Sequence, residues 1–239
     1  MKLNEDFTTR SKIGDVGRWY ATEFVKGVSE GLSHGEFVLD AGAGECAYRR
    51  FFQHCKYISV DLAVGEERWN YTNLDCIAVL DRLPFENASF DAVLCTQVLE
   101  HLEWPRETLR EFNRILKPGG RLFLTAPMSH SEHQVPYDFF RYTSFGLRSL
   151  CEYANFTQIE VRASGGGFVR MAYEFPQILS IFPRTGFGSG KLQIKGLILF
   201  PLRMATFVLV RLFQMVFLWM DRFDKIRNHP FGWSVVAKK

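Results

Sequence analysis

One short stretch, Phe37 to Phe51 (FVLDAGAGECAYRRF), constrains the fold of this chain more than any other. An apolar run, Phe37 to Leu39, leads directly into Asp40 and a turn that contains Gly42 and Gly44. The apolar residues after the turn recur at helical spacing, so the predicted order is strand, glycine turn, helix. In an α/β sheet this order places the turn at the carboxyl edge, where ligands bind, and the glycines let a ligand approach the backbone closely.

A second strand, Tyr57 to Val60, ends in an acid, Asp61. A carboxylate at the end of the second strand is well placed to accept both hydroxyls of a ribose, so the sequence predicts a cofactor that contains a nucleoside. The glycine turn alone does not choose the cofactor. A nicotinamide-binding G-x-G-x-x-G unit tolerates alanine at its third position, which is Ala47 here.

Further motifs follow in order, and together they are far more specific than the turn. They are Leu83-Pro84-Phe85, Ser89-Phe90-Asp91, Val98-Leu99-Glu100-His101 and Leu116-Lys117-Pro118-Gly119-Gly120. From Val38 to Arg162 the chain resembles the class I S-adenosylmethionine-dependent methyltransferases, in particular the subgroup with an LPF…SFD…VLEH…LKPGG pattern. The resemblance implies an α/β fold: a Rossmann-like, seven-stranded, mostly parallel sheet with helices on both faces. It also implies S-adenosylmethionine as the cofactor and methyl transfer as the reaction.

The same resemblance assigns the cofactor contacts to the glycine turn, the end of the second strand and the end of the strand Phe90 to Cys95. The expected residues are Asp40, Gly42, Ala43, Gly44, Asp61, Leu62, Asp81, Thr96 and Gln97. One position departs from the pattern. Relatives usually carry an acid four residues before the leucine of L-P-F, where it meets the adenine amino group, and Val79 stands there in this chain. Backbone groups near Leu80 and Asp81 are therefore expected to bind the base.

The segment Ala126 to Thr143 concentrates histidine, aspartate, tyrosine and arginine at the same sheet edge. It resembles the H-x-x-P-x-D-F-x-R-x-T segment of bacterial methyltransferases of surface-polysaccharide or lipid-linked saccharide pathways. The alternative is a surface loop whose polar groups are only solvated. An alcohol or phenol acceptor must lose a proton, and histidine suits that role near neutral pH. The candidate bases are His133 and Asp138, with His130 behind them; Tyr137, Arg141, Tyr142 and Trp19 are candidate substrate contacts. No second histidine stands at ligand spacing from His101, so no metal site is predicted.

Other signals outline the rest of the domain. Apolar spacing and capping residues predict helices from Asp15 to Gly31, from Pro105 to Leu116, and from a cap at Thr143 or Ser144 to Ala154. Phe156 to Val161 is predicted as a strand, and Phe168 to Phe175 as the closing strand of the sheet. The chain is divided into a methyltransferase domain, residues 1–180, and a linker with an apolar helical tail, residues 181–239.

The tail contains a long apolar stretch, Leu192 to Met220. Polar residues interrupt it at Lys195, Arg203, Arg211 and Gln214 and fall within about half of one helical face. Three interpretations compete: a membrane-spanning helix, a helix packed on its own domain or on a second copy, and a basic helix at a lipid surface. The composition favours the third, with peripheral membrane contact through residues 191–225.

Composition adds limits. A net charge of +3 gives no reason to expect nucleic acid. The five cysteines form no C-x-x-C pair, and the first ten residues lack the apolar core of a signal peptide, so a cytoplasmic protein is predicted, at the inner membrane face. The predicted reaction is O-methylation of a sugar or a lipid-linked acceptor. The alternatives are a soluble or quinone-like acceptor, and a non-catalytic partner subunit that binds the cofactor. The oligomeric state stays open.

Overall fold

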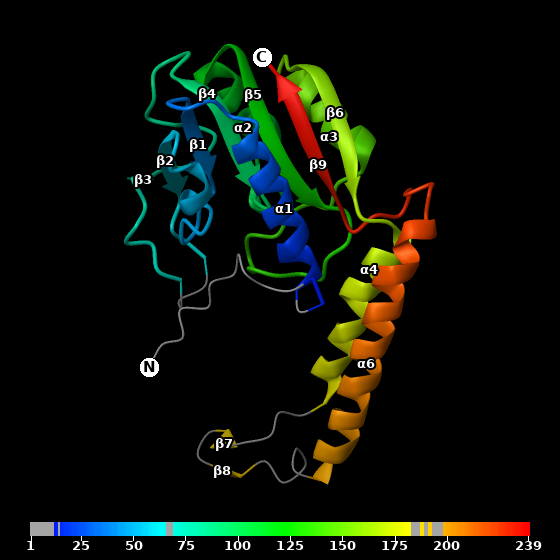
Figure 1. The fold of residues 1–239 in the computed structure, drawn as a ribbon. Helices are drawn as coiled ribbons and strands as arrows, with labels where there is room; N and C mark the ends of the chain where they lie inside the picture. Colours follow the sequence, from blue (N-terminus) through cyan, green and yellow to red (C-terminus); the bar gives the residue numbers. More distant parts are fainter. Residues whose placement is uncertain (1–11, 14, 66–68, 183–186, 189–190, 193–197) are drawn as a thin grey trace.

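The computed structural model describes residues 12–13, 15–65, 69–182, 187–188, 191–192 and 198–239 (Figure 1). Its centre is a seven-stranded sheet in the order β3-β2-β1-β4-β5-β9-β6. The strands are β1 (Phe37–Ala41), β2 (Lys56–Asp61), β3 (Cys76–Ile77), β4 (Phe90–Thr96), β5 (Leu116–Pro127), β6 (Thr157–Ser164) and β9 (Gly232–Lys238). Within this sheet all described pairings are parallel except those of β9, which is antiparallel to β5 and β6. The predicted mostly parallel sheet is confirmed.

Helices cover both faces of this sheet (Figure 1). On one face lie α1 (Val16–Glu30) and the short 3₁₀ helix η2 (Arg49–Phe52); on the other lie α2 (Pro105–Ile115) and α3 (Ser144–Tyr153). Side chains of β1 alternate between the two cores, so Val38 packs toward α1 while Leu39 packs toward α2 and α3.

Local capping explains where two of these helices begin. The Asp15 carboxylate accepts a hydrogen bond from the backbone N–H of Arg18 at 3.0 Å, and α1 starts at Val16, directly after Asp15. The Thr143 hydroxyl accepts one from the backbone N–H of Gly146 at 3.1 Å at the start of α3. Both starts agree with the sequence, because N-caps are local signals.

The helix predicted directly after the glycine turn is wrong. The chain passes through positive φ at Gly42, Gly44 and Cys46 (84°, 52° and 60°) and forms only the single turn η2 afterwards. A left-handed residue cannot continue a right-handed helix, so the apolar spacing of this stretch reflects packing of turns and η2 under α1.

The predicted closing strand is also wrong. Residues Phe168 to Phe175 lie in and at the end of a helix, α4 (Gly167–Glu174). The strand that completes the sheet is β9, at the end of the chain, where Trp233, Val235 and Ala237 alternate into the main core. The segment 181–239 therefore supplies one strand of the sheet in addition to the apolar helix.

Between β6 and β9 the chain forms two packed helical segments, which we call the helical hairpin: residues 167–181 (α4 and the 3₁₀ helix η4, Phe175–Ile181) and residues 200–220 (α6, Phe200–Met220). Figure 1 shows it projecting beyond the carboxyl edge of the parallel strands, with the short ribbon β7 (Phe187–Gly188) and β8 (Lys191–Leu192) near its far end.

Polar residues of α6 hold this hairpin together. Gln214 is buried and donates its amide to the carbonyl of Ala172 on α4 at 2.9 Å. Just after α6, the Asp221 carboxylate accepts the backbone N–H groups of Gly166 and Val169 at 3.0 and 3.1 Å, which caps α4. Arg211 donates to Gln214 at 2.7 Å. These side chains face protein, so the prediction that the polar side of the tail faces lipid phosphates does not fit Arg211 and Gln214.

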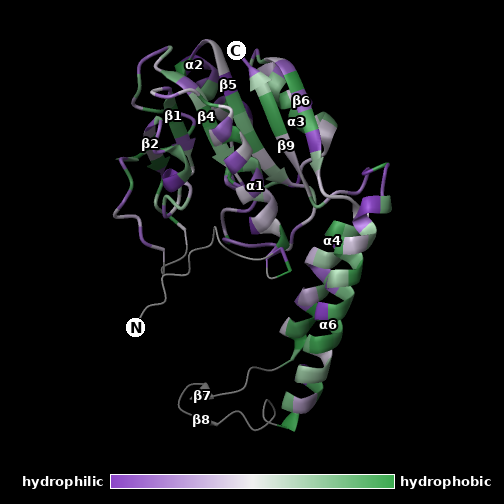
Figure 2. Ribbon diagram, viewed as in Figure 1, coloured by the Kyte–Doolittle hydropathy of each residue, from purple (hydrophilic) through white to green (hydrophobic). Residues whose placement is uncertain are grey.

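The outward side of the hairpin is apolar (Figure 2). On α6 the exposed large apolar side chains are Phe200, Leu202, Met204, Phe207, Val208, Leu209, Leu212, Phe213, Met215, Val216 and Trp219, each at least 38% exposed. By length and composition the segment Phe200–Phe223 suffices to cross a membrane, and only 11% of its apolar window is buried. The core helix of a soluble protein would be mostly buried, whereas this helix is not.

Candidate functional site

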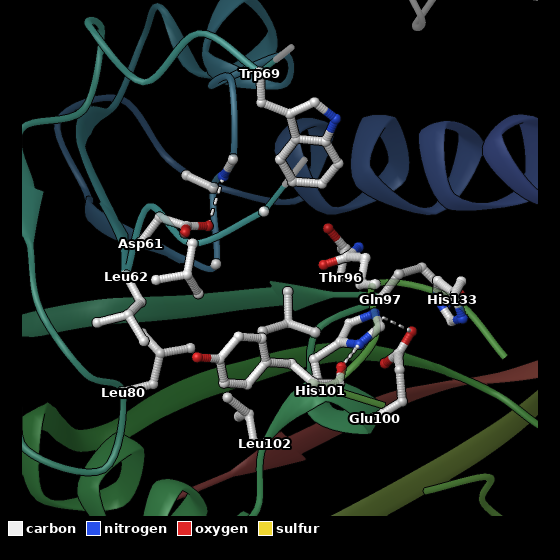
Figure 3. Close-up of a pocket in the computed structure, with 18 of the residues that line it drawn as sticks. Asp61, Leu62, Trp69, Leu80, Thr96, Gln97, Glu100, His101, Leu102 and His133 are labelled. Carbon is white, nitrogen blue, oxygen red and sulfur yellow. Dashed lines mark hydrogen bonds and ion pairs between the residues drawn. The ribbon is translucent and has the colours of Figure 1, made fainter. Parts of the chain in front are cut away.

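A large cavity opens at the carboxyl edge of the sheet, where the strand order reverses between β1 and β4. Its volume is about 1520 Å³. Typical ligand pockets measure roughly 300–1,000 Å³, so this one has room for a cofactor together with an acceptor. In Figure 3 the side chains of Asp61 and Leu62 lie toward one end, and Gln97, Glu100, His101 and His133 lie toward the other. We call these the cofactor end and the acceptor end.

The glycine turn forms part of the cofactor end. The backbone N–H groups of Gly42 and Ala43 donate to the Val60 carbonyl at 2.8 and 3.1 Å, which joins the turn to β2. Gly42 has φ of 84°, and a Cβ there would lie 2.3 Å from a methyl carbon of Val98. Only glycine fits both the torsion and the space. Gly42, Ala43 and Gly44 all line the cavity, as the sequence predicts.

Asp61 stands at the end of β2 with its carboxylate fixed by backbone groups. One oxygen accepts the N–H of Gly44 at 2.9 Å and the other accepts the N–H of Ala63 at 2.8 Å. A carboxylate has about four acceptor sites, so two remain for the hydroxyls of a ribose. Asp61 lines the cavity, and the oriented carboxylate, the open glycine turn and the adjacent Leu62 suit a nucleoside.

The remaining cofactor-end residues come from later loops. Leu62, Val79 and Leu80 line the cavity and offer an apolar wall for a base, and Asp81 lines it as well. Trp69, which the sequence did not single out, covers the glycine turn. The Cβ position of Gly44 would lie 3.5 Å from the Trp69 ring.

Thr96 and Gln97 line the cavity at the end of β4. Gln97 has φ of 54°, and two hydrogen bonds to Thr125 on β5 hold it, at 3.0 Å through its backbone N–H and 3.1 Å through its side chain. A non-glycine residue in this region costs free energy, and such strained positions cluster at functional sites.

Asp40 differs from its predicted role, because it does not line the cavity. Its side chain is 1% exposed; one oxygen accepts the hydroxyl of Tyr57, and the other has no hydrogen-bond partner in the described part of the chain. Burial raises the pKa of Asp40 to about 7. Asp40 supports the turn from beneath rather than contacting a ligand.

The raised pKa of Asp40 predicts a pH effect on stability. Between about pH 4 and pH 7 the folded chain keeps a proton that the unfolded chain has lost, so the free energy of unfolding falls as pH rises through this window. Asp40→Asn removes this titration. Urea unfolding measures the free energy of unfolding at pH 5 and at pH 7.5. Between these two pH values it should fall by roughly 2 kcal/mol more in the wild type than in the variant. Equal losses in the two proteins would contradict the assignment.

At the acceptor end, His130, His133 and Tyr137 line the cavity, as predicted, while Asp138, Arg141 and Tyr142 do not. The Asp138 carboxylate forms a two-pronged ion pair with Arg141, at 2.7 and 2.8 Å, and accepts the backbone N–H of His133 at 2.9 Å. The Arg141 guanidinium holds the pKa of Asp138 well below its usual range. Asp138 is therefore a poor base, and the pair acts to position the loop around His133.

Two other predicted substrate contacts lie outside the cavity. Tyr142 is buried and donates its hydroxyl to the Leu99 carbonyl at 2.9 Å, so it belongs to the core. Trp19 packs edge-on against Tyr20, with the Lys12 ammonium 4.4 Å from its ring centre. Arg18, from the same helix, does line the cavity.

The structure adds acceptor-end residues that the sequence left unassigned: Glu100 and His101 in the 3₁₀ helix η3 (Leu99–His101), Tyr173 on α4, and Phe231 before β9. Burial raises the pKa of Glu100 to about 8 and lowers that of His101. Burial, followed by the neighbouring His130 and His101, lowers the pKa of His133 to about 4, so His133 is neutral at pH 7 and a weaker base than an ordinary histidine.

Comparison with known proteins agrees with this geometry. Residues 39–124 match the family described as "Methyltransferase domain". A ubiquinone biosynthesis O-methyltransferase of Idiomarina loihiensis is 31% identical over 116 residues, 43% of this chain and 46% of that protein. A sarcosine/dimethylglycine N-methyltransferase of Halorhodospira halochloris is 30% identical over 129 residues, 48% of this chain and 46% of that protein. The matches thus span less than half of each of these relatives.

Solved structures share the fold at low sequence identity. An S-adenosylmethionine-dependent methyltransferase from Archaeoglobus fulgidus aligns with a TM-score of 0.52 at 15% identity, over 91% of this chain and 94% of that one. A Burkholderia thailandensis 1,6-didemethyltoxoflavin-N1-methyltransferase, solved with S-adenosylhomocysteine, aligns with a TM-score of 0.54 at 17% identity, over 92% and 78%. Residues 39–124 therefore match the methyltransferase domain family, in a chain that shares its fold with solved S-adenosylmethionine-dependent methyltransferases.

Proposed function

We propose that this protein transfers the methyl group of S-adenosylmethionine to a hydroxyl oxygen of a lipid-linked acceptor, such as a lipid-linked saccharide, at the cytoplasmic face of a membrane. One observation supports the membrane location in this proposal: the helical hairpin is apolar on its outward side and also contributes a residue to the lining of the cavity. Tyr173 of α4 lines the acceptor end and packs on Phe231, with ring centres 4.5 Å apart. A bilayer that touches the hairpin would lie beside the opening through which an acceptor enters.

The chemistry asks for little beyond positioning. S-adenosylmethionine supplies a methyl group that is already activated. The protein has to hold the acceptor oxygen in line with that group and exclude water, and such orientation supplies much of the acceleration in reactions between two bound molecules. Neutral His133 is available to take the hydroxyl proton, and His130 stacks beside it at 4.1 Å between ring centres. Tyr137 and Tyr173 offer apolar walls with polar tips for the acceptor.

A second candidate is a soluble or quinone-like acceptor. The similarity to ubiquinone biosynthesis O-methyltransferases favours it, including 46% identity over 48 residues to a Xanthomonas oryzae protein. That stretch is 20% of this chain, so it does not choose the acceptor. The fold alone does not fix the reaction either, because a protein described as the [4+2]-cyclase SpnF aligns with a TM-score of 0.55.

Product partitioning tests the proposal. Purified protein is incubated with S-adenosylmethionine carrying a tritiated methyl group and with vesicles that contain polyprenyl-pyrophosphate-linked saccharides. The expected label appears in the organic phase, and less than about a tenth of it remains with His133→Ala, because general-base groups contribute roughly 10²–10⁴-fold. His34→Ala, at an exposed histidine of the loop before β1, is the matched control with unchanged rate. A parallel reaction replaces the vesicles with a water-soluble phenol. Label transferred only in that reaction would favour the second candidate, and cofactor binding without transfer in either reaction would refute both.

A further inference from the structure

The acceptor end contains a cluster of three potential metal ligands from two distant parts of the chain. Glu100 and His101 belong to η3, directly after β4, and His133 belongs to the loop that follows β5. One ligand atom from each residue can be chosen so that all three lie within 4.8 Å of one another. The rings of His101 and His133 meet edge to face with centres 4.6 Å apart.

We propose that Glu100, His101 and His133 bind a divalent transition-metal cation beside the acceptor. Two ligands of one such ion, each about 2.1 Å from it, lie about 3.4 Å apart in a tetrahedral site, so a pair at the 4.8 Å limit has to close by about 1.4 Å. This closure requires rotation of the side chains, and the His133 side chain is partly exposed. Two neutral imidazoles and one carboxylate suit zinc, iron or manganese, and they leave coordination positions open for a substrate oxygen.

The first supporting observation is a pair of buried atoms. Oε2 of Glu100 and Nε2 of His101 are both buried, and neither has a hydrogen-bond partner among the described residues. Glu100 is only 1% exposed, and its other oxygen, Oε1, lies 3.9 Å from Nε2 of His101 (Figure 3). Buried polar atoms without partners are rare and costly, and an ion between these groups would satisfy both.

The second observation is the way the two histidine rings are held. Nδ1 of His101 lies 2.5 Å from the Tyr137 carbonyl, and Nδ1 of His133 lies 3.1 Å from the Ser131 carbonyl. A carbonyl oxygen only accepts, so each Nδ1 donates and each neutral ring presents a free lone pair at Nε2. Metal-binding histidines almost always donate their other ring nitrogen to a carbonyl or carboxylate in this manner.

The third observation is that the backbone fixes the two parts of the cluster to each other. The N–H groups of Phe139 and Phe140 donate to the Glu100 carbonyl at 2.9 and 3.2 Å. Arg141 further ties the loop through the carbonyls of His130 and Ser131, each at 3.0 Å. The two backbone segments that carry the ligands are therefore fixed to each other before an ion arrives, and only the side chains have to rotate.

The role of the ion in the reaction rests on the proposed function. A bound cation polarises a hydroxyl and lowers its pKa. With Nε2 of His133 on the ion, His133 acts as a ligand and no longer as the base. The acceptor oxygen then attacks the methyl carbon, the carbon–sulfur bond breaks with its electron pair staying on sulfur, and the hydroxyl proton passes to His130 or to water.

Metal binding is tested without reference to activity. Tag-free protein is stripped with a chelator, dialysed against Zn²⁺, Co²⁺ or Mg²⁺, and its metal content is measured, with the visible spectrum of Co²⁺ reporting nitrogen and oxygen ligands. We expect one equivalent of Zn²⁺ or Co²⁺ in the wild type and in His34→Ala. Affinity should fall by at least about 100-fold in Glu100→Gln and in His133→Ala, since even residues behind the ligands contribute 10–100-fold.

Glu100 is buried, so Glu100→Gln could fail to fold, whereas the His133 side chain is 26% exposed and tolerates truncation. Wild-type protein without Zn²⁺ or Co²⁺, or His133→Ala with unchanged affinity, overturns the site. Calorimetry with S-adenosylmethionine and the labelled-methyl assay are run on the same samples. Absence of S-adenosylmethionine binding or of methyl transfer would count against the proposed function. It would not change the conclusion about metal binding, which is measured separately.

Discussion

Replacing Gly42 by alanine is expected to weaken S-adenosylmethionine binding by about 100-fold, equivalent to roughly 2.7 kcal/mol. The added methyl group would lie 2.3 and 2.6 Å from the two methyl carbons of Val98, at a φ of 84° that alanine disfavours. The turn has to shift, and it carries the backbone that faces the cofactor. Isothermal titration calorimetry measures the change, and circular dichroism checks that the variant is folded.

Two further variants identify the cause. Gly27→Ala changes a glycine inside α1 where the new methyl meets no atom within 4 Å, so binding should be unchanged and stability slightly higher. Val98→Ala combined with Gly42→Ala removes the two closest contacts, leaves the Cβ of residue 98 at 3.0 Å, and keeps the unfavourable φ. Partial recovery of affinity would assign the loss to the clash, and full wild-type affinity in Gly42→Ala alone would refute the assignment of this turn to the cofactor.

Placing two carboxylates on the outward side of α6 is expected to abolish membrane binding. Leu209 and Val216 are 54% and 49% exposed and lie two helical turns apart on the same side. Burying each apolar side chain in lipid contributes roughly 1.5–3 kcal/mol, so Leu209→Asp with Val216→Asp should reduce partitioning by about 100-fold or more. Flotation of the protein with anionic phospholipid vesicles measures this.

Phe145→Asp is the matched control, because Phe145 is an 83% exposed apolar residue on α3, outside the hairpin. It should float like the wild type. Should the double variant also float, the hairpin is not the lipid contact. Light scattering without vesicles separates the remaining alternative, since a hairpin that pairs with a second copy would yield a dimer that the two carboxylates dissociate.

Local signals in the sequence were sufficient for much of the cofactor end. The glycine turn and the acid at the end of the second strand are each defined by residues close together in the sequence. A short window of sequence is therefore enough to recognise them. The N-caps at Asp15 and Thr143 were readable for the same reason. Asp40 was misplaced, because alternation along β1 decides which way a side chain points, and the carboxylate is directed beneath the turn toward Tyr57.

The acceptor end depends on contacts between distant segments, which no short window reveals. His101 and His133 meet only because backbone hydrogen bonds fold the loop after β5 onto η3. The ion pair between Asp138 and Arg141 could have been predicted from the sequence, since the two residues lie three positions apart. The strength of that ion pair depends on burial, which the sequence does not give. Helix α4 was mistaken for a strand because the carboxylate that caps it, Asp221, comes from a residue more than 50 positions further along the chain.

Across the β6 and β9 pair, Ser164 lies opposite Gly232. The whole of residues 165–231 is thus one long excursion that leaves and re-enters the sheet at neighbouring points. Closing a loop costs only about 0.6 kcal/mol more for each doubling of its length, so adding or removing such an excursion changes the free energy of loop closure very little. A tight turn from Ser164 to Gly232 would give an excised core that keeps all strands of the seven-stranded sheet. Replacing residues 165–231 by another segment would therefore change the apolar surface of the protein without altering those strands.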